Sequence, residues 1–311
     1  MSEKIPINII ELPETEYFES GHTACAGCGG ALAVRQAMKI LGDKTIVYTP
    51  ACCLLVFGST YPLNAWRTPF FQCAFENSAA VAAGVAAALK RKGINDVNAV
   101  VFAGDGGTVD IGLQAISGAA ERNDNVLYIC YDNEAYGNTG MQRSGATPFG
   151  AWTTTTPVGT IIKGKTEHKK DFPRIMISHS IPYVATATVA FWRDYMQKVA
   201  RAKDMRGFRY LHVLSPCPVG WRASTGDTIK LSRLAVETGL WILYECDHGA
   251  FRFTGPSRLI AEGMKQRKPV KEYLQLQGRF RHLTDKDIAL IQEWIDKIWQ
   301  EYSKFAASTK G

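Results

Sequence analysis

The chain of 311 residues is long enough for two average domains or for one large α/β domain with extended loops. Its composition, 46% hydrophobic and 21% charged, is that of a folded protein with enough apolar material for a sizeable core. The net charge of +7 comes from scattered basic residues rather than from a concentrated stripe with stacking aromatics, so no nucleic-acid partner is expected.

No apolar run approaches the roughly 18–20 residues that a membrane-spanning helix needs. Residues 1–18 lack a basic region followed by an apolar core, so we expect a cytoplasmic protein. The densest basic clusters, residues 265–271 and 168–170, are interpreted as solvated surface. The alternative is that they steer an acidic redox partner or an anionic cofactor.

Short apolar runs alternate with longer helical patterns, which predicts βα units and a mainly parallel sheet. In chain order, the predicted strands are 45–49, 99–103, 126–131, 183–188, 210–214 and 241–244. The predicted helices are 31–41, 77–91, 110–120, 192–203 and 228–237. A long C-terminal helix follows, and Thr284 with Asp287 resembles a capping box at its start.

Two segments lack regular periodicity. Residues 133–170 are rich in Gly, Thr and Pro, and an irregular stretch of this length is more often functional than idle. Residues 247–283 also look irregular, and 273–283 are expected to form an arm that reaches a partner. We divide the chain into an N-terminal arm (1–20), a cofactor-binding domain (21–245) and a C-terminal extension with its helix (246–311).

The apolar strand that begins at Val100 runs directly into the turn Gly104-Asp105-Gly106-Gly107. Backbone N–H groups in such a turn, backed by a helix N-terminus, form an anion site. Asp105 at the strand end can hold a divalent cation. Alone the motif is weak, because an ordinary turn has the same composition.

The next strand, 126–131, ends in a second polar segment that contains Asn133 and Ala135. In a parallel sheet this end lies at the same edge as Asp105. Asp105, the side-chain oxygen of Asn133, the carbonyl of Ala135, two phosphate oxygens and a water would complete the octahedral set that Mg²⁺ prefers. A Gly-Asp-Gly turn followed about 27 residues later by an Asn-bearing strand end is the signature of thiamine diphosphate.

The segments that follow resemble the β subunits of multi-subunit pyruvate:ferredoxin oxidoreductases. The matching stretches are 136–148, 150–156, 183–187, 216–221 and 277–282, within a resemblance that covers residues 20–285. It implies a three-layer αβα thiamine-diphosphate-binding fold with a mainly parallel sheet. It also implies that Asp105, Asn133 and Ala135 bind Mg²⁺, with the glycines of the turn at the diphosphate. Asn138 would lie beside the reactive thiazolium carbon as the catalytic residue.

Eight cysteines in a cytoplasmic chain are not expected to form structural disulfides. Cys130 lies within an apolar run and is interpreted as a buried small hydrophobe, as are the isolated Cys73 and Cys246. The pair Cys25 and Cys28 could be half of a zinc site, a dithiol or half of an iron–sulfur site, and spacing alone does not separate these.

The resemblance implies one [4Fe–4S] cluster held by Cys25, Cys28, Cys53 and Cys217. The third ligand is ambiguous, because Cys52 adjoins Cys53. The Leu-Leu-Val that follows and the offset to the Tyr-Pro pair at 61–62 favour Cys53, with Cys52 as an extra thiol nearby.

The implied reaction converts pyruvate and coenzyme A reversibly to acetyl-CoA and CO₂ and passes electrons through the cluster to ferredoxin. An α subunit would supply the pyrimidine-side glutamate and substrate contacts, alongside γ and ferredoxin-like δ subunits or fused equivalents, so this chain alone should be inactive. Glu76 is either part of a helix start or a cofactor-side residue. The alternatives are the same machinery acting on oxalate without coenzyme A or on a branched 2-oxoacid, a non-redox thiamine decarboxylase with structural zinc, and a non-catalytic electron-transfer module.

Overall fold

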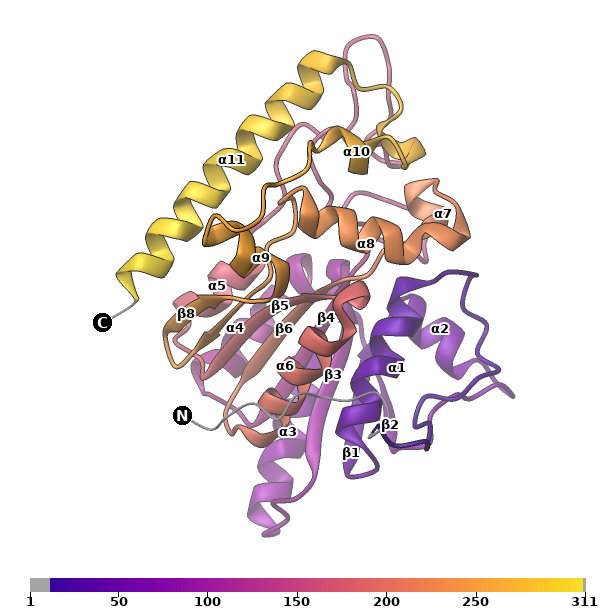
Figure 1. Ribbon diagram of the computed structural model, residues 1–311. Helices are drawn as coiled ribbons and strands as arrows, with labels where there is room; N and C mark the ends of the chain where they lie inside the picture. The colour runs from indigo at the N-terminus through magenta and orange to yellow at the C-terminus, as the bar shows by residue number, and fades with distance from the viewer. Residues whose placement is uncertain (1–11, 310–311) are drawn as a thin grey trace.

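The protein is described by a computed structural model that covers residues 12–309, and a single mixed sheet organises it (Figure 1). Along the sheet the strand order is β2-β1-β3-β4-β6-β5-β7-β8. The strands are β1 Thr45–Pro50, β2 Phe70–Cys73, β3 Asn98–Gly104, β4 Val126–Asp132, β5 Tyr183–Thr188, β6 Arg209–Leu214, β7 Tyr244–Asp247 and β8 Ala250–Phe253. All pairings from β2 to β5 are parallel, and β7 and β8 extend the sheet in antiparallel fashion.

Helices cover both faces of the sheet. They are α1 Gly29–Leu41, α2 Cys53–Ser59, α3 Ser78–Arg91, α4 Leu113–Glu121, α5 Phe172–Ser178, α6 Trp192–Asp204, α7 Pro218–Trp221, α8 Thr228–Glu237, α9 Gly255–Ala261, α10 Lys271–Leu274 and α11 Asp285–Ser308. Helices α1 and α6 pack on one face, while α3, α4 and α5 pack on the other. The long helix α11 runs diagonally past the other elements of the C-terminal extension (Figure 1). The predicted three-layer αβα arrangement is confirmed.

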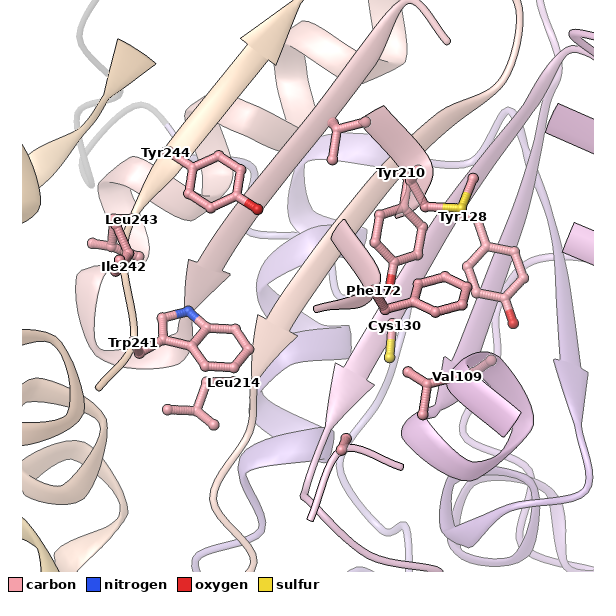
Figure 2. Packing of buried hydrophobic residues seen from close by; sticks show 14 of the residues in the cluster. Val109, Tyr128, Cys130, Phe172, Tyr210, Leu214, Trp241, Ile242, Leu243 and Tyr244 are labelled. Atoms are coloured by element: carbon pink, nitrogen blue, oxygen red, sulfur yellow. The ribbon is translucent and has the colours of Figure 1, made fainter. Parts of the chain in front are cut away.

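The central strands are buried on both faces, so they read as continuous apolar runs. Side chains alternate between the layers: Val100 and Phe102 of β3 join the cluster beneath α1, whereas Val101 joins the opposite one. Figure 2 shows that opposite cluster, where Tyr128 and Cys130 of β4 lie near Phe172 of α5. Cys130 is fully buried, as the sequence indicates.

The sequence placed most central elements correctly and missed the short peripheral ones. Strands β2 and β8 and helices α2, α5, α7, α9 and α10 were not predicted. The strand expected at 241–244 is shifted: β7 begins only at Tyr244, because the backbone N–H of Trp241 bonds to Ala235 at the end of α8. The capping box of α11 is confirmed, with Thr284 and Asp287 bonded reciprocally.

The two irregular segments have different outcomes. No helix or strand lies between Asp132 and Phe172, as expected. The expectation for 247–283 was wrong, since β8, α9 and α10 lie there. The predicted arm at 273–283 packs inward instead, with Tyr273 and Arg279 almost completely buried.

Two of the predicted domain limits can be compared with the elements of the structure. The boundary between 245 and 246 falls within β7, and residues 1–11 of the predicted N-terminal arm lie outside the described residues. Within the described range, no helix combines the length and apolar character needed to cross a membrane.

Candidate functional site

The ends of β3 and β4 bring the two polar motifs together. Their parallel register places Gly104 beside Tyr131, so the residues that follow each strand leave the sheet at one edge. A cavity of about 170 Å³ opens there. Its lining combines the glycine turn, the end of β4 and the start of α2, and includes Gly104, Asp105, Gly106, Gly107, Asn133, Ala135, Asn138, Cys52 and Cys53.

The glycine turn is tight because the cavity wall approaches it closely. A Cβ on Gly106 would lie 2.5 Å from Cε1 of Tyr136, and one on Gly107 would lie 3.3 Å from the ring of Phe75. Residues Gly106–Asp110 form one turn of π-helix, a geometry often found at functional sites. This turn explains why α4 begins at Leu113 rather than at the predicted residue 110.

Asp105 is a fully buried carboxylate at the head of this turn. Ser144 Oγ donates a hydrogen bond to Oδ2, and the Asn133 N–H donates to Oδ1 at 3.4 Å. Burial, followed by the charge of Asp132, raises the pKa of Asp105 well above its ordinary value. A divalent cation would reverse this effect by stabilising the ionised form.

The end of β4 is held in a defined turn. Asn133 is 8% exposed, and its Oδ1 accepts the N–H of Ala135 at 3.3 Å. The backbone carbonyl of Asn133 accepts the indole N–H of Trp221 at 2.8 Å. Asn138 lies at the rim of the cavity with its side chain exposed.

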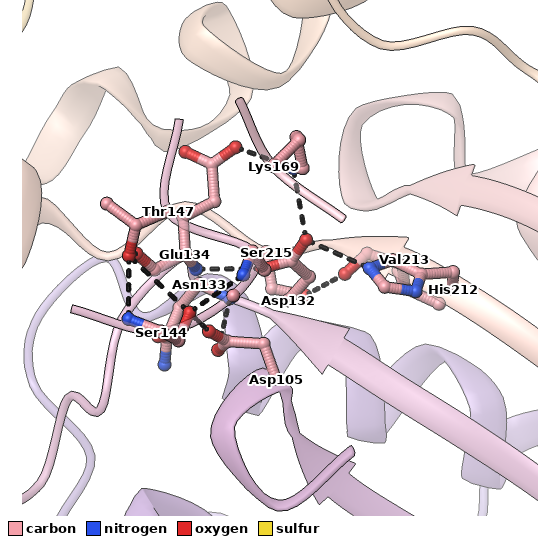
Figure 3. Close-up of polar contacts among 12 residues, drawn as sticks. Asp105, Asp132, Asn133, Glu134, Ser144, Thr147, Lys169, His212, Val213 and Ser215 are labelled. Atoms are coloured by element: carbon pink, nitrogen blue, oxygen red, sulfur yellow. Dashed lines mark hydrogen bonds and ion pairs between the residues drawn. The ribbon is translucent and has the colours of Figure 1, made fainter. Parts of the chain in front are cut away.

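Behind the turn lies a buried ionic network (Figure 3). Lys169 Nζ lies 3.3 Å from Asp132 Oδ2 and 3.0 Å from Glu134 Oε1, and His212 Nε2 lies 2.9 Å from Asp132 Oδ2. Burial alone would raise the pKa of Asp132, but Lys169 and His212 lower it to about 2. The interpretation of residues 168–170 as solvated surface was therefore wrong for Lys169, whose side chain is 14% exposed.

The cysteine segments converge beside this cavity. The thiol of Cys53 lies within electrostatic range of Cys25, Cys28 and Cys217. Burial raises the pKa of the Cys28, Cys53 and Cys217 thiols, and each also lies near at least one other thiol of the group. These thiols therefore stay protonated unless a cationic partner stabilises their thiolates.

Backbone contacts bring the first and last cysteine segments together. The N–H of Gly29, next to Cys28, donates to the carbonyl of Pro216 at 3.0 Å. Cys217 Sγ in turn accepts the N–H of Gly220 at 3.3 Å. Among residues 12–309, no three His, Cys, Asp or Glu side chains lie close enough to share one metal ion.

The adjacent thiols of Cys52 and Cys53 have different surroundings. Cys52 contacts the Tyr131 hydroxyl and backbone groups, including that of Gly104. Cys53 Sγ would lie 3.2 Å from a Cβ on Gly137, on the side of the strand end. Of the remaining cysteines, Cys246 is buried as expected, whereas Cys73 is only half-buried because β2 is an edge strand.

Glu76 lies just before α3 and does not line the cavity. Its side chain is exposed, whereas the preceding Phe75 faces the glycine turn. The cap residue of α3 is Asn77, whose side chain makes no capping hydrogen bond.

Sequence reasoning assigned no role to several residues that build this site. They are Asp132, Glu134, Ser144, Lys169, His212, Trp221 and Arg279. Polar residues within apolar strands, such as His212 in β6, are the one local signal that could have pointed to a buried network.

Comparison with known proteins decides the family. The profile described as thiamine pyrophosphate enzyme, C-terminal TPP binding domain, matches residues 52–213. Pyruvate synthase subunit PorB of Methanothermobacter thermautotrophicus is 53% identical over 292 residues, which cover 94% of this chain and 99% of that relative. The chain belongs to the family of thiamine-diphosphate-dependent 2-oxoacid:ferredoxin oxidoreductase subunits.

A second group of relatives in this family carries a different name. Ketoisovalerate oxidoreductase subunit VorB of Pyrococcus abyssi is 45% identical over 302 residues, 96% of each chain. A solved 2-oxoglutarate:ferredoxin oxidoreductase from Magnetococcus marinus matches 72% of this chain and 82% of its own, with a TM-score of 0.56 and 23% identity. The structural match supports the fold.

Proposed function

We propose that this chain holds thiamine diphosphate, Mg²⁺ and a [4Fe–4S] cluster in a pyruvate:ferredoxin oxidoreductase. The observation that carries the proposal is the single cavity lined by the glycine turn, the end of β4 and Cys53. The complete enzyme would convert pyruvate and coenzyme A reversibly to acetyl-CoA and CO₂, passing the electrons through the cluster to ferredoxin.

The donor set at the strand ends fits Mg²⁺ and a diphosphate. Asp105, the side-chain oxygen of Asn133 and the carbonyl of Ala135 are hard oxygen ligands of the kind Mg²⁺ prefers. Their residues line the cavity beside the turn formed by Gly104, Gly106 and Gly107, whose backbone N–H groups would bind the diphosphate. When bound, thiamine diphosphate supplies the carbanion-stabilising chemistry. Asn138, exposed at the rim, would lie beside the reactive thiazolium carbon as the catalytic residue.

The cysteines of this site fit a [4Fe–4S] cluster, which takes four thiolates, one on each iron. Cys25, Cys28 and Cys217 lie near Cys53, which lines the cofactor cavity. Four thiolates also suit a structural zinc ion, and the position beside the cofactor cavity favours the redox cluster. A non-redox decarboxylase would need no such site next to its cofactor cavity.

A partner subunit must complete the site. Asp105 is the only carboxylate among the described residues that line the cavity. Since Asp105 belongs to the metal set, the glutamate that contacts the pyrimidine ring would come from the α subunit, together with much of the substrate grip. The γ and δ subunits and ferredoxin would take the electrons onward.

Pyruvate is favoured as the substrate because the relatives named pyruvate synthase reach 53% identity. A branched 2-oxoacid is the second candidate, since the ketoisovalerate oxidoreductase relative is 45% identical over nearly the whole chain. Both reactions would use the same residues of this chain.

Turnover of the intact complex tests the proposal. Ferredoxin reduction should require pyruvate, coenzyme A and thiamine diphosphate together, and 2-oxoisovalerate should be the poorer substrate by kcat/KM. Reduction of ferredoxin by oxalate in the absence of coenzyme A would instead identify oxalate as the substrate. Decarboxylation of pyruvate with no electron transfer would contradict it.

A further inference from the structure

Glu134 lies between two of the proposed metal-binding residues but faces away from the cavity. Asn133 and Ala135 line the cavity, whereas Glu134 does not. Figure 3 shows its carboxylate on the opposite side of the strand end from Asp105. Its side chain is fully buried, and its φ of 65° is in the left-handed region. That conformation costs a non-glycine residue roughly 1–2 kcal/mol, so the surroundings must hold it.

Two cationic side chains from distant parts of the chain form ion pairs with this carboxylate. Lys169, 35 residues downstream, binds Oε1 at 3.0 Å. Arg279, 145 residues downstream in the C-terminal extension, binds Oε2 through Nη2. The Arg279 side chain is 2% exposed, so this ion pair is screened little by solvent. We call Glu134, Lys169 and Arg279 the Glu134 clamp.

The clamp also reaches the backbone on both sides of the metal-binding turn. The Arg279 guanidinium lies 4.0 Å from the ring centre of Trp221, whose indole N–H binds the carbonyl of Asn133. Thr147 Oγ1 donates to the carbonyl of Glu134 at 2.6 Å. The turn that presents Asn133 and Ala135 to the cavity is therefore fixed by groups that do not line that cavity.

We infer that Glu134 is a positioning residue for the metal–diphosphate site and that Arg279 of the C-terminal extension is its principal partner. The inference rests on the proposed function, because it concerns how the turn is presented to Mg²⁺ and the diphosphate. Glu134→Gln keeps the side-chain shape but removes the charge that holds both cations. Outer partners of metal ligands typically contribute roughly 10–100-fold in affinity.

The test is equilibrium binding of thiamine diphosphate at fixed Mg²⁺, and of Mg²⁺ at fixed thiamine diphosphate, to the cofactor-stripped intact complex. Glu134→Gln should weaken both affinities by roughly 10–100-fold. The kcat at saturating cofactor should stay within about threefold of the wild-type value, because Glu134 touches no reacting group. Glu245→Gln is the matched control. Glu245 is also buried and bound by Tyr183 and two arginines, but lies on β7, away from the cavity.

A double-mutant cycle distinguishes positioning from general destabilisation. Arg279→Gln alone should weaken the binding of thiamine diphosphate and Mg²⁺. The same substitution should reduce these affinities less when Glu134→Gln is already present than it does in the wild type. Where Glu134→Gln fails to assemble, Trp221→Phe removes the N–H bonded to Asn133 together with part of the ring that stacks on Arg279, and it should weaken Mg²⁺ affinity in the same direction. Wild-type affinities in Glu134→Gln, or equal losses in Glu134→Gln and Glu245→Gln, would overturn the inference. A wild-type complex that binds no thiamine diphosphate would instead overturn the proposed function.

Discussion

Replacing Gly29 with alanine should separate the first and last cysteine segments. Gly29 is the first residue of α1, next to Cys28, and packs against the backbone that precedes Cys217. A Cβ at this position would lie 2.7 Å from the backbone N and O of Pro216, where ordinary contacts begin at 3.4 Å. Because backbone atoms cannot rotate away, the two segments must move apart by about 0.7 Å, the difference between these distances.

That displacement matters more for a metal centre than for folding. Metal–ligand distances in proteins hold to within about 0.2 Å, so a shift of about 0.7 Å should prevent simultaneous binding by Cys28 and Cys217. Overpacking typically costs about 1–3 kcal/mol. The expected loss of stability is therefore about 1–3 kcal/mol, and the complex should still assemble.

The assay combines iron content, visible absorbance and thermal unfolding of the anaerobically purified complex. Gly84→Ala is the control, because Gly84 lies within α3, where an added Cβ would meet no neighbouring atom within 4 Å. We expect Gly84→Ala to keep all iron and gain slightly in Tm, and Gly29→Ala to lose about four irons per copy of this chain. Full iron content and unchanged visible absorbance in Gly29→Ala would refute the reasoning.

Three other experiments test separate parts of the structure. Gly106→Ala, whose Cβ would meet the Tyr136 ring at 2.5 Å, should weaken thiamine diphosphate binding at least tenfold in equilibrium dialysis, and unchanged affinity would contradict the assignment of the turn. Cys53→Ser should lose the cluster by iron analysis and electron paramagnetic resonance while Cys52→Ser keeps it; the reverse result would exchange their roles. Burial lowers the pKa of Lys165 from 10.5 to about 8, so its destabilisation is present below pH 8 and is relieved as the pH rises toward 10.5. In urea unfolding, the free energy of unfolding of the wild type should therefore rise relative to that of Lys165→Met between pH 8 and pH 10.5. The same pH dependence in both proteins would refute this.

The sequence was sufficient to predict the elements whose signal is local. The runs 99–103 and 126–131 are apolar throughout because β3 and β4 are covered on both faces, and each run is followed by a short polar segment. The topology rule for parallel sheets then placed Asp105 and Asn133 at one edge without coordinates, and the structure brings both to one cavity.

Residues that act through distant contacts could not be found in this way. Lys169 looked like one of three consecutive basic residues on a surface, yet it is buried between Asp132 and Glu134. Arg279 lay in a segment interpreted as a projecting arm, because no sequence pattern shows that a carboxylate 145 residues earlier binds it. Their pairing depends on the tertiary fold and not on local spacing.

Short edge elements were missed for a different reason. Strand β8 has only four residues and alternates between exposed and buried positions, so it carries little apolar signal. The expected strand at 241–244 failed because Trp241 is apolar but serves the packing around α8 instead of a strand. A buried strand and a buried loop both give a short apolar run in the sequence, so an apolar run alone does not distinguish them.

The measurement that tests the central claim most directly is the cofactor content of the intact complex with and without Cys217. Thiamine diphosphate, Mg²⁺, iron and zinc should be determined for the wild type and Cys217→Ser after identical anaerobic purification. The account predicts that the variant loses about four irons per copy of this chain while thiamine diphosphate and Mg²⁺ stay at wild-type levels. Unchanged iron, or loss of one zinc in place of iron, would contradict the claim that this subunit carries both the thiamine cofactor and the cluster.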